Sequence, residues 1–217
     1  MTNDTPVIRN KNNKCSGPYL LCNDPPHYIT PVELSDIPEV VRVLNINKDV
    51  YYGTGSFEYP HLESHARARI EARITGNNET GYTACWAMRT SPEGPLMGWI
   101  HAHFLPPGSA THPETGRDLK IGVIGYWVSP EHVRRGYGSR SARFIVHEIL
   151  FKERGCVIVR AVAYRDNIAS RRVLEAAGMR CEVEEKVVFS NKLGKEMVDS
   201  CYAVHRDSST LSVITPN

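Results

Sequence analysis

The sequence lacks the features that mark several common classes of protein. A net charge of only +2 in 217 residues does not favour a nucleic acid or an anionic membrane as a partner. No apolar run approaches the roughly 20 residues that span a bilayer, and the N-terminus has no apolar segment typical of a secretory signal. We therefore expect a cytoplasmic protein that binds neither nucleic acid nor a membrane.

The six cysteines are scattered along the chain and include no Cys-x-x-Cys pair. The spacing of common zinc sites is therefore absent, and the chain length and expected compartment disfavour a disulfide framework. Cys85, Cys156 and Cys181 lie in or beside predicted strands, where a cysteine is usually a small buried hydrophobic residue.

The composition is that of a globular protein, with 41% hydrophobic and 23% charged residues. The length suits one sizeable domain. Residues 1–27 are rich in Asn, Asp, Lys and Pro without periodicity, which predicts an N-terminal extension that is loose or wraps the domain. The domain itself is expected at 28–206, and residues 207–217 are expected to form a C-terminal tail.

Helical and strand patterns alternate between these ends and indicate an α/β fold. Strands are predicted at about 28–32, 82–89, 96–105, 119–128, 156–163, 181–190 and 195–205. Helices are predicted from Ser35 onward, at about 61–74, at about 138–153 and at about 167–177. The segment 156–163 is almost entirely apolar, which is typical of a strand with a parallel neighbour. With the preceding strand and helix it forms a right-handed βαβ unit in a mixed sheet flanked by about four helices.

A glycine-rich turn lies between the strand at 119–128 and the helix at 138–153. Gly136 and Gly138 have no Cβ, so the backbone can adopt unusual φ angles and approach a ligand closely. Amides at a helix N-terminus form an anion site, to which Arg134 and Arg135 add charge. The turn consists of Val133, Arg134, Arg135, Gly136, Tyr137, Gly138 and Ser139.

This turn predicts a phosphate-bearing ligand but does not identify it. A Walker loop is excluded because no Gly-Lys-Ser/Thr occurs, and a dinucleotide fingerprint is disfavoured because a third glycine is missing. A basic strand-to-helix turn with purely structural glycines is the alternative.

Two further segments narrow the choice of ligand. They are Gly-Tyr-Trp-Val-Ser-Pro at 125–130 and Asn-Ile-Ala-Ser-Arg-Arg-Val-Leu-Glu-Ala-Ala-Gly-Met at 167–179. In this order and spacing around the turn, residues 28–205 resemble the GNAT superfamily of N-acyltransferases, in particular its RimJ/RimL-like branch of ribosomal-protein N-acetyltransferases. The resemblance implies a GNAT-type mixed sheet of six to seven strands that splays after the strand at 119–128.

The resemblance also implies acetyl-CoA as cosubstrate and a role for each motif. Backbone groups of Trp127 and Val128 would pair with the pantetheine arm. Amides from Arg134 to Ser139, with that of Val133, would hold the pyrophosphate. Asn167 and Ser170 would contact the pantetheine or its phosphate end.

Two positions depart from the pattern of the family. Val133 replaces a Gln or Arg but still offers its backbone amide. Leu174 replaces the tyrosine that many members use as general acid, so Ser170 or a water would have to protonate the leaving thiolate. Tyr126 is expected to pack or to line the acceptor pocket rather than to act as the acid. Arg171 and Arg172 would reach the 3′-phosphate of the coenzyme or, alternatively, form a solvated helix face.

Acetyl transfer requires an oxyanion donor and a base that frees the amine of its proton. The amide of Val128 is the expected oxyanion donor. His101 and His103, which share one face of their strand, are candidate bases, as are Glu58 with His61 in the loop before the helix at 61–74, and Glu131. A structural role is the alternative for each. The His-x-His pair has no evident third ligand, so no metal is expected.

The sequence therefore predicts an acetyl-CoA-dependent N-acetyltransferase that moves an acetyl group to a primary amine by direct attack in a ternary complex. The acceptor would be a small-molecule amine or a protein N-terminal amine, and the protein a monomer or homodimer. Two alternatives are open: a non-catalytic sensor that binds acyl-CoA, and a module for another phosphate ligand such as a nucleotide.

Overall fold

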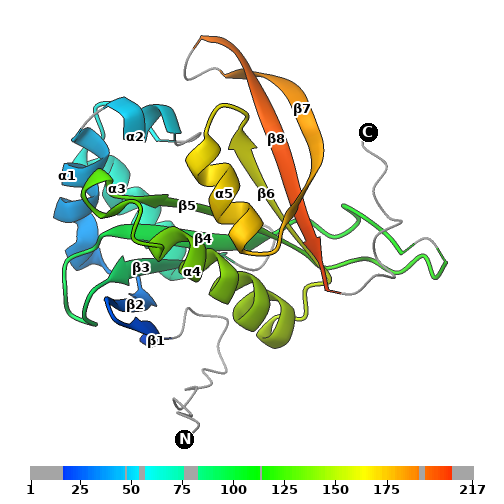
Figure 1. Ribbon diagram of the computed structural model, residues 1–217, viewed down its shortest axis with the longest axis horizontal. Helices are drawn as coiled ribbons and strands as arrows, with labels where there is room; N and C mark the ends of the chain where they lie inside the picture. Colours follow the sequence, from blue (N-terminus) through cyan, green and yellow to red (C-terminus); the bar gives the residue numbers. More distant parts are fainter. Residues whose placement is uncertain are drawn as a thin grey trace, which may run out of the picture.

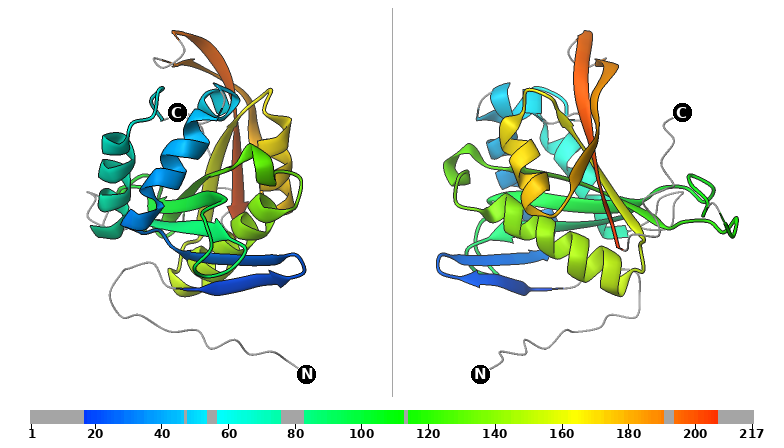
Figure 2. Two further views of the ribbon diagram at one scale, coloured as in Figure 1. Left: turned by 90° about the vertical axis from the view of Figure 1, so that its left-hand side faces the viewer. Right: turned by 45° about the vertical axis from the view of Figure 1, so that its right-hand side comes forward.

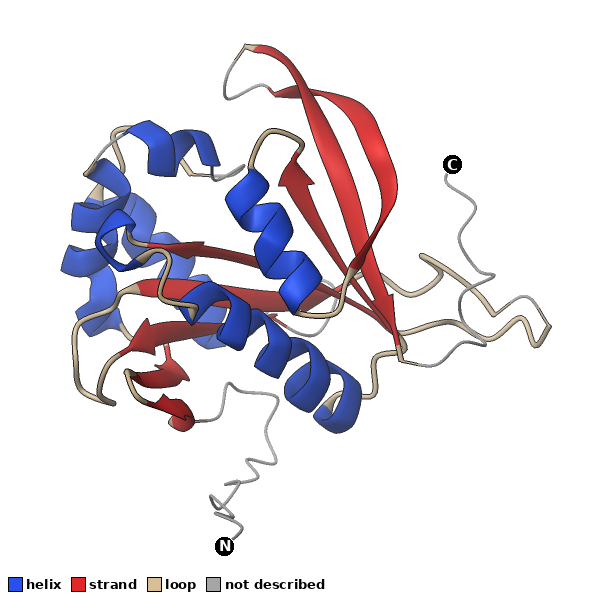
Figure 3. Cartoon of the chain, viewed as in Figure 1, coloured by secondary structure: helices blue, strands red, loops and turns tan. Residues whose placement is uncertain are grey.

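The computed structural model describes residues 17–46, 48–53, 57–75, 83–112, 114–190 and 194–206. In these residues the chain forms one eight-stranded sheet with helices on both faces (Figures 1 and 3). The order across the sheet is β1-β2-β3-β4-β5-β6-β8-β7. The strands are β1 (Tyr19–Asn23), β2 (Pro26–Pro31), β3 (Thr83–Arg89), β4 (Gly98–Phe104), β5 (Ile121–Val128), β6 (Ile158–Tyr164), β7 (Arg180–Ser190) and β8 (Lys195–His205).

The helices separate into two groups (Figure 2). On one face lie the 3₁₀ turn η1 (Leu34–Asp36), α1 (Ile37–Asn45) and α3 (Glu63–Thr75), with α2 (Lys48–Gly53) following α1. On the other face lie α4 (Tyr137–Phe144), its π-helical continuation η3 (Ile145–Glu153) and α5 (Ile168–Ala176), and a 3₁₀ turn, η2 (Pro130–His132), precedes α4. Among the described residues no helix is both long and apolar enough to cross a membrane.

The mixed α/β class and the strands from 82 to 205 are confirmed within a few residues, and β5 and β6 are parallel as predicted. The predicted count of six to seven strands was too low. Tyr19–Asn23 forms β1, paired antiparallel with β2, in a stretch that the sequence analysis assigned to an extension. Helix α2 was also not predicted. Residues 1–16 and the tail at 207–217 lie outside the described residues.

The two faces of the sheet bury separate cores. Ile100, Ala102 and Ile124 pack under α4, η3 and α5. On the opposite face Trp99 and Trp127 pack under α1 and α3. Trp99 is therefore covered by helices, whereas His101 and His103 on the same strand face are partly exposed.

Strands β5 and β6 diverge, and this divergence positions the site. They pair only where Ile121, Gly122 and Val123 face Ile158, Val159 and Arg160. Beyond that point β6 leaves β5 and continues with β8, and the two arms of the sheet separate (Figure 1). The splay predicted after the strand at 119–128 is thus present.

Candidate active site

The glycine-rich turn before α4 has the backbone of an anion-binding concavity. Arg134 has a φ of 63° and Gly136 a φ of 76°, both in the left-handed region, and Gly136 is the N-cap of α4. Among the described residues Arg134 is the only non-glycine residue with a positive φ. Such strained backbone is concentrated at functional sites. The turn and the first amides of α4 therefore form a concavity of the kind that binds phosphate.

The side chain of Arg140 forms a hydrogen bond with the backbone of this turn. Its Nη2 donates to the carbonyl oxygen of Arg135 at 2.8 Å, and its Nε donates to Nδ1 of His27 at 3.3 Å. Burial, assisted by the charge of Arg140, lowers the pKa of His27 to about 4. His27 is therefore neutral at pH 7. Because its Nδ1 accepts from Arg140, its Nε2 carries the proton and donates to Ser141 Oγ at 3.2 Å.

Strand β5 directs alternate backbone groups toward the splay. Leu105 N donates to Ile121 O at 3.0 Å, and Ser129 N donates to Met97 O at 2.7 Å at the opposite end of the β4–β5 ladder. Both bonds show that the odd-numbered residues of β5 direct their backbone groups toward β4. In an antiparallel ladder this alternation assigns the backbone groups of Trp127 to β4. The amides and carbonyls of Tyr126 and Val128 face the other way, into the splay.

The start of α5 lies across the splay from β5. Asn167 caps the helix as predicted, since its Oδ1 accepts from Ser170 N at 3.1 Å. Tyr126 Oη donates to the carbonyl of Ser170 and lies 2.9 Å from Ser170 Oγ. Burial raises the pKa of Tyr126, so its phenol is protonated at neutral pH. Leu174 is fully buried in the core and offers no proton.

A cavity of about 230 Å³ occupies the splay. Residues 124–127 of β5 form one wall and residues 161–164 of β6 the other, and Asn167 and Ser170 add the start of α5. His101 of β4, Asp199 of β8, Gly53 of α2 and the aromatic side chains of Phe57 and Trp99 complete the lining. The cavity thus joins the predicted cofactor motifs to residues from the α1–α3 face.

Several polar atoms around this cavity have no partner. Trp99 Nε1, His101 Nδ1, Trp127 Nε1 and Asp199 Oδ1 are buried, and no described residue forms a hydrogen bond with them. Buried polar atoms are normally hydrogen-bonded, because leaving one unpaired costs about 1–3 kcal/mol. Their concentration here indicates a place that receives a polar ligand.

The comparisons with known proteins agree with this geometry. Residues 28–180 match the family described as acetyltransferase (GNAT) domain, and this match covers most of the chain. The chain belongs to the GNAT acetyltransferase family. It is thus an acetyl-CoA-dependent N-acyltransferase, as the motifs implied. No curated protein sequence matches the chain.

Solved GNAT structures share the fold at low sequence identity. A GNAT-family acetyltransferase from Bacillus anthracis is 21% identical, with a TM-score of 0.64 over 82% of this chain and 94% of its own. RimJ from Mycobacterium smegmatis, in complex with CoA-disulfide, is 15% identical, with a TM-score of 0.60 over 83% of this chain and 82% of its own. AAC(6')-Ib, in complex with ribostamycin and coenzyme A, is 15% identical, with a TM-score of 0.59 over 83% and 93%.

Only one of the two candidate histidine bases lines the cavity of this GNAT domain. His101 does so, with its ring lying against Gly125, whereas His103 stacks on it at a ring-centroid distance of 6.2 Å and does not line the cavity. Burial lowers the pKa of His101 to about 3, with further contributions from Arg73 and His103. A neutral imidazole with so low a proton affinity is a weak base at pH 7.

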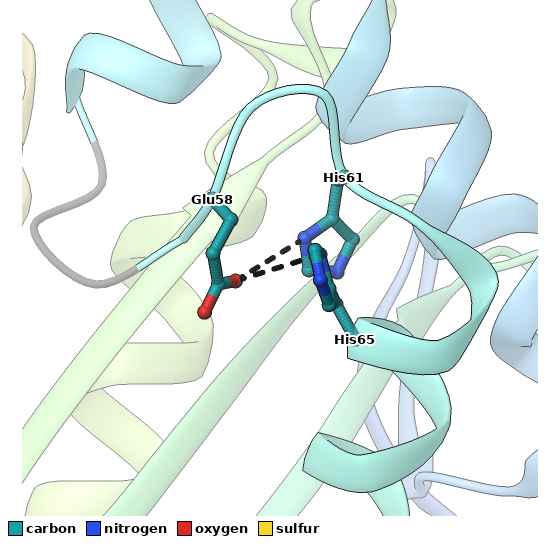
Figure 4. Close-up of side chains that lie close together, drawn as sticks. All are labelled: Glu58, His61 and His65. Carbon is teal, nitrogen blue, oxygen red and sulfur yellow. Dashed lines mark ion pairs between the residues drawn. The ribbon is translucent and has the colours of Figure 1, made fainter.

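Glu58 belongs to a separate cluster with His61 in the loop before α3 and His65 in the first turn of α3 (Figure 4). Its Oε2 lies 3.7 Å from His61 Nδ1 and 4.0 Å from His65 Nδ1. Arg69 Nη2 lies 3.3 Å from both carboxylate oxygens. Burial raises the pKa of Glu58, but a backbone hydrogen bond and the charge of Arg69 outweigh it, and the net pKa is lowered. The side-chain oxygen and nitrogen atoms of Glu58, His61 and His65 that could bind a metal lie within 4.8 Å of one another. The Arg69 guanidinium, however, already neutralises the carboxylate.

Two other candidate residues are occupied by ion pairs. Glu131 accepts from Arg42 Nη2 at 2.8 Å. Arg171 contacts Glu184 at 2.6 Å and donates to Tyr202 Oη at 2.8 Å, so its guanidinium is directed at β7 and β8. Val133, as expected for a residue that offers only its amide, has an exposed side chain.

Asp199, which lines the cavity from β8, was not predicted as a site residue. Asp199 faces Tyr164 of β6 and Lys186 of β7 in register. Burial raises its pKa, and the nearby charge of Lys186 opposes this. The signal in the sequence is an acidic residue between Met197 and Val198 on one side and Cys201 to Val204 on the other, in the middle of a predicted strand.

Proposed function

We propose that this GNAT domain moves the acetyl group of acetyl-CoA to a primary amine by direct attack in a ternary complex. The observation that carries the proposal is the cavity at the divergence of β5 and β6, which has cofactor motifs on one side and unpaired polar atoms on the other. Both substrates would meet there. None of the described residues that line the cavity is a cysteine, which favours direct transfer over an acyl-enzyme.

The cofactor would extend from the turn into the splay. Amides from Val133 to Ser139 would hold the pyrophosphate, with the guanidinium groups of Arg134 and Arg135 beside it. The backbone groups of Tyr126 and Val128 would pair with the pantetheine arm, and Asn167 and Ser170 would border it from α5. The ladder alternation supports Tyr126 in this role in place of the backbone of Trp127.

The amide of Val128 would stabilise the tetrahedral oxyanion, because it faces the splay. Ser170 Oγ, held by Tyr126, would pass a proton to the departing thiolate in the absence of a tyrosine at Leu174. Solved structures with this fold come from enzymes with different acceptors. One is a ribosomal-protein-S5-alanine acetyltransferase, and AAC(6')-Ib was solved with ribostamycin. The proposal therefore covers two kinds of acceptor, protein N-terminal amines and small-molecule amines.

Release of free thiol from acetyl-CoA in a panel of amines tests this function. We expect amine-dependent release and binding of acetyl-CoA that ATP and NAD do not displace. Tight binding without release for every amine would instead identify a sensor of acyl-CoA. Absence of acetyl-CoA binding, with binding of ATP or NAD, would identify a module for another phosphate ligand.

A further inference from the structure

Asp199 is the acidic side chain of the cavity lining. It lies on β8, across the splay from β5, and its Oδ1 is buried without a hydrogen-bond partner among the described residues. A buried carboxylate oxygen without a partner is costly, and proteins keep such groups mainly where a ligand or a reaction needs them.

The groups that face Asp199 leave its carboxylate available. Tyr164 on β6 and Lys186 on β7 are its neighbours in register, and His101 lies in the same cavity. No described residue forms an ion pair with Asp199, although Lys186 is near enough to affect its charge. His101 is neutral, so it does not compete for the carboxylate as a cation.

The face on which Asp199 lies is the one opposite the glycine-rich turn. Tyr202 of β8 is buried in the core under α4 and α5. Alternation along the strand therefore places Asp199 on the other face, with Trp99 and His101. The cofactor motifs and Asp199 thus approach the cavity from opposite faces of the sheet.

We propose that Asp199 binds the ammonium group of the acceptor and removes its proton, so that the acceptors of this enzyme are cationic primary amines. The inference rests on the proposed function. The aromatic rings of Phe57, Trp99 and Trp127 complete a lining that suits a cation, because ring faces attract positive charge and their bodies pack against an apolar stem.

Attack by a protonated amine requires a base such as Asp199 that accepts its proton. An alkyl ammonium has a pKa of about 10, so nearly all of it is protonated at neutral pH. Asp199 takes one proton from the nitrogen, and the freed lone pair forms a bond to the thioester carbonyl carbon. The carbon–sulfur bond then breaks, the sulfur keeps the electron pair, and the second proton of the nitrogen passes to the sulfur. Asp199 returns its proton to the solvent after the products leave.

Comparison of Asp199→Asn with Glu196→Gln tests the assignment. Both variants remove one carboxylate from β8, but Glu196 is exposed. For cationic amines we expect Asp199→Asn to lower kcat/KM by about 100-fold or more, the usual scale of general-base catalysis. The Kd of acetyl-CoA should stay within about twofold, and Glu196→Gln should behave as the wild type.

Three comparisons separate a catalytic role of Asp199 from a structural one: uncharged against cationic acceptors, the dependence of the rate on pH, and the variant Asp199→Glu. An arylamine that is uncharged at pH 7 should lose much less activity in Asp199→Asn than an alkyl diamine or a peptide with a free N-terminal amine. The rate of Asp199→Asn with cationic amines should recover as the pH rises toward the amine pKa. Separately, the activities toward the diamine and toward the peptide distinguish a small-molecule acceptor from a protein acceptor. Asp199→Glu, which keeps the charge, should retain partial activity.

Equal activity of Asp199→Asn and wild type toward cationic amines, or equal losses for cationic and uncharged amines, would overturn the assignment while leaving the proposed function intact. A wild-type enzyme that binds acetyl-CoA but acetylates no amine would overturn both. The melting temperature of Asp199→Asn should equal or exceed that of the wild type, because the variant removes an unpaired buried charge.

Discussion

Arg134 holds a left-handed backbone conformation that normally favours glycine. Arg134→Gly should therefore stabilise the protein by about 1 kcal/mol, whereas Arg134→Ala should not, since alanine keeps the strain. Both variants lose the guanidinium, so both should weaken acetyl-CoA binding by roughly tenfold. Urea unfolding and calorimetry measure the two effects. Tighter binding by Arg134→Gly would show that backbone strain, not charge, controls the affinity.

Gly125 allows the His101 ring to lie against β5. A Cβ at this position would come within 2.5 Å of His101 Cε1, so Gly125→Ala should destabilise the protein by about 1–3 kcal/mol. The additional substitution His101→Ala removes the obstructing ring and should recover most of that loss. A double variant whose stability is simply the sum of the two single losses would refute this contact.

The connection between η1 and β3 depends on one buried ion pair. Arg89 Nη2 donates to Asp36 Oδ1 at 2.6 Å, and its Nε donates to Thr30 Oγ1 at 2.8 Å. Asp36→Ala leaves the guanidinium buried and unpaired and should cost about 3–5 kcal/mol in the free energy of unfolding. The control is Glu148→Gln in the exposed Lys152 pair, which should cost less than about 0.5 kcal/mol. Similar losses in urea unfolding for both variants would show that the buried pair has no special weight.

The elements that the sequence predicted well are those with long periodic patterns or strong boundary residues. The helix after Asn167 and the apolar strand before it have both, and the structure has them at nearly the expected positions. β1 and α2 were missed because each is only five or six residues long, too short to show a period. β1 is also flanked by Pro18 and Pro25, which indicate a loop when no partner strand is known.

Within the whole molecule, burial lowers the pKa of five histidines, and the effect is large for three of them. Burial is the largest cause that lowers the pKa of His27 and His61 to about 4 and that of His101 to about 3. The unfolded chain takes up these protons near pH 6.5, whereas the folded chain does not. Stability should therefore be constant above about pH 6.5 from these groups and fall as the pH drops toward 4.

The slope should be about 1.4 kcal/mol per pH unit for each histidine that stays neutral. Urea unfolding at several pH values between 7 and 4.5 measures it. In His27→Gln this slope should be smaller by up to about 1.4 kcal/mol per pH unit, the contribution of one proton. A slope that does not change in this variant would mean that His27 is already protonated in the folded state.

The backbone of the three motifs was predictable from the sequence, because the turn, the strand end and the α5 start carry local signals. The acceptor half was not, because its members are distant in the chain and each alone resembles an ordinary structural residue. Asp199 follows the predicted cofactor motifs by some 20 residues or more, and only the pairing of β8 with β6 brings it to the cavity. Side-chain orientation was likewise hidden: nothing in the sequence shows that Arg69 neutralises Glu58.

A crystal structure with bound acetyl-CoA tests the central claim most directly. We expect the pyrophosphate at the amides of 134–139 and the thioester in the splay between β5 and β6, with its carbonyl oxygen within hydrogen-bond distance of Val128 N. A coenzyme bound elsewhere, or a thioester outside the β5–β6 cavity, would contradict it.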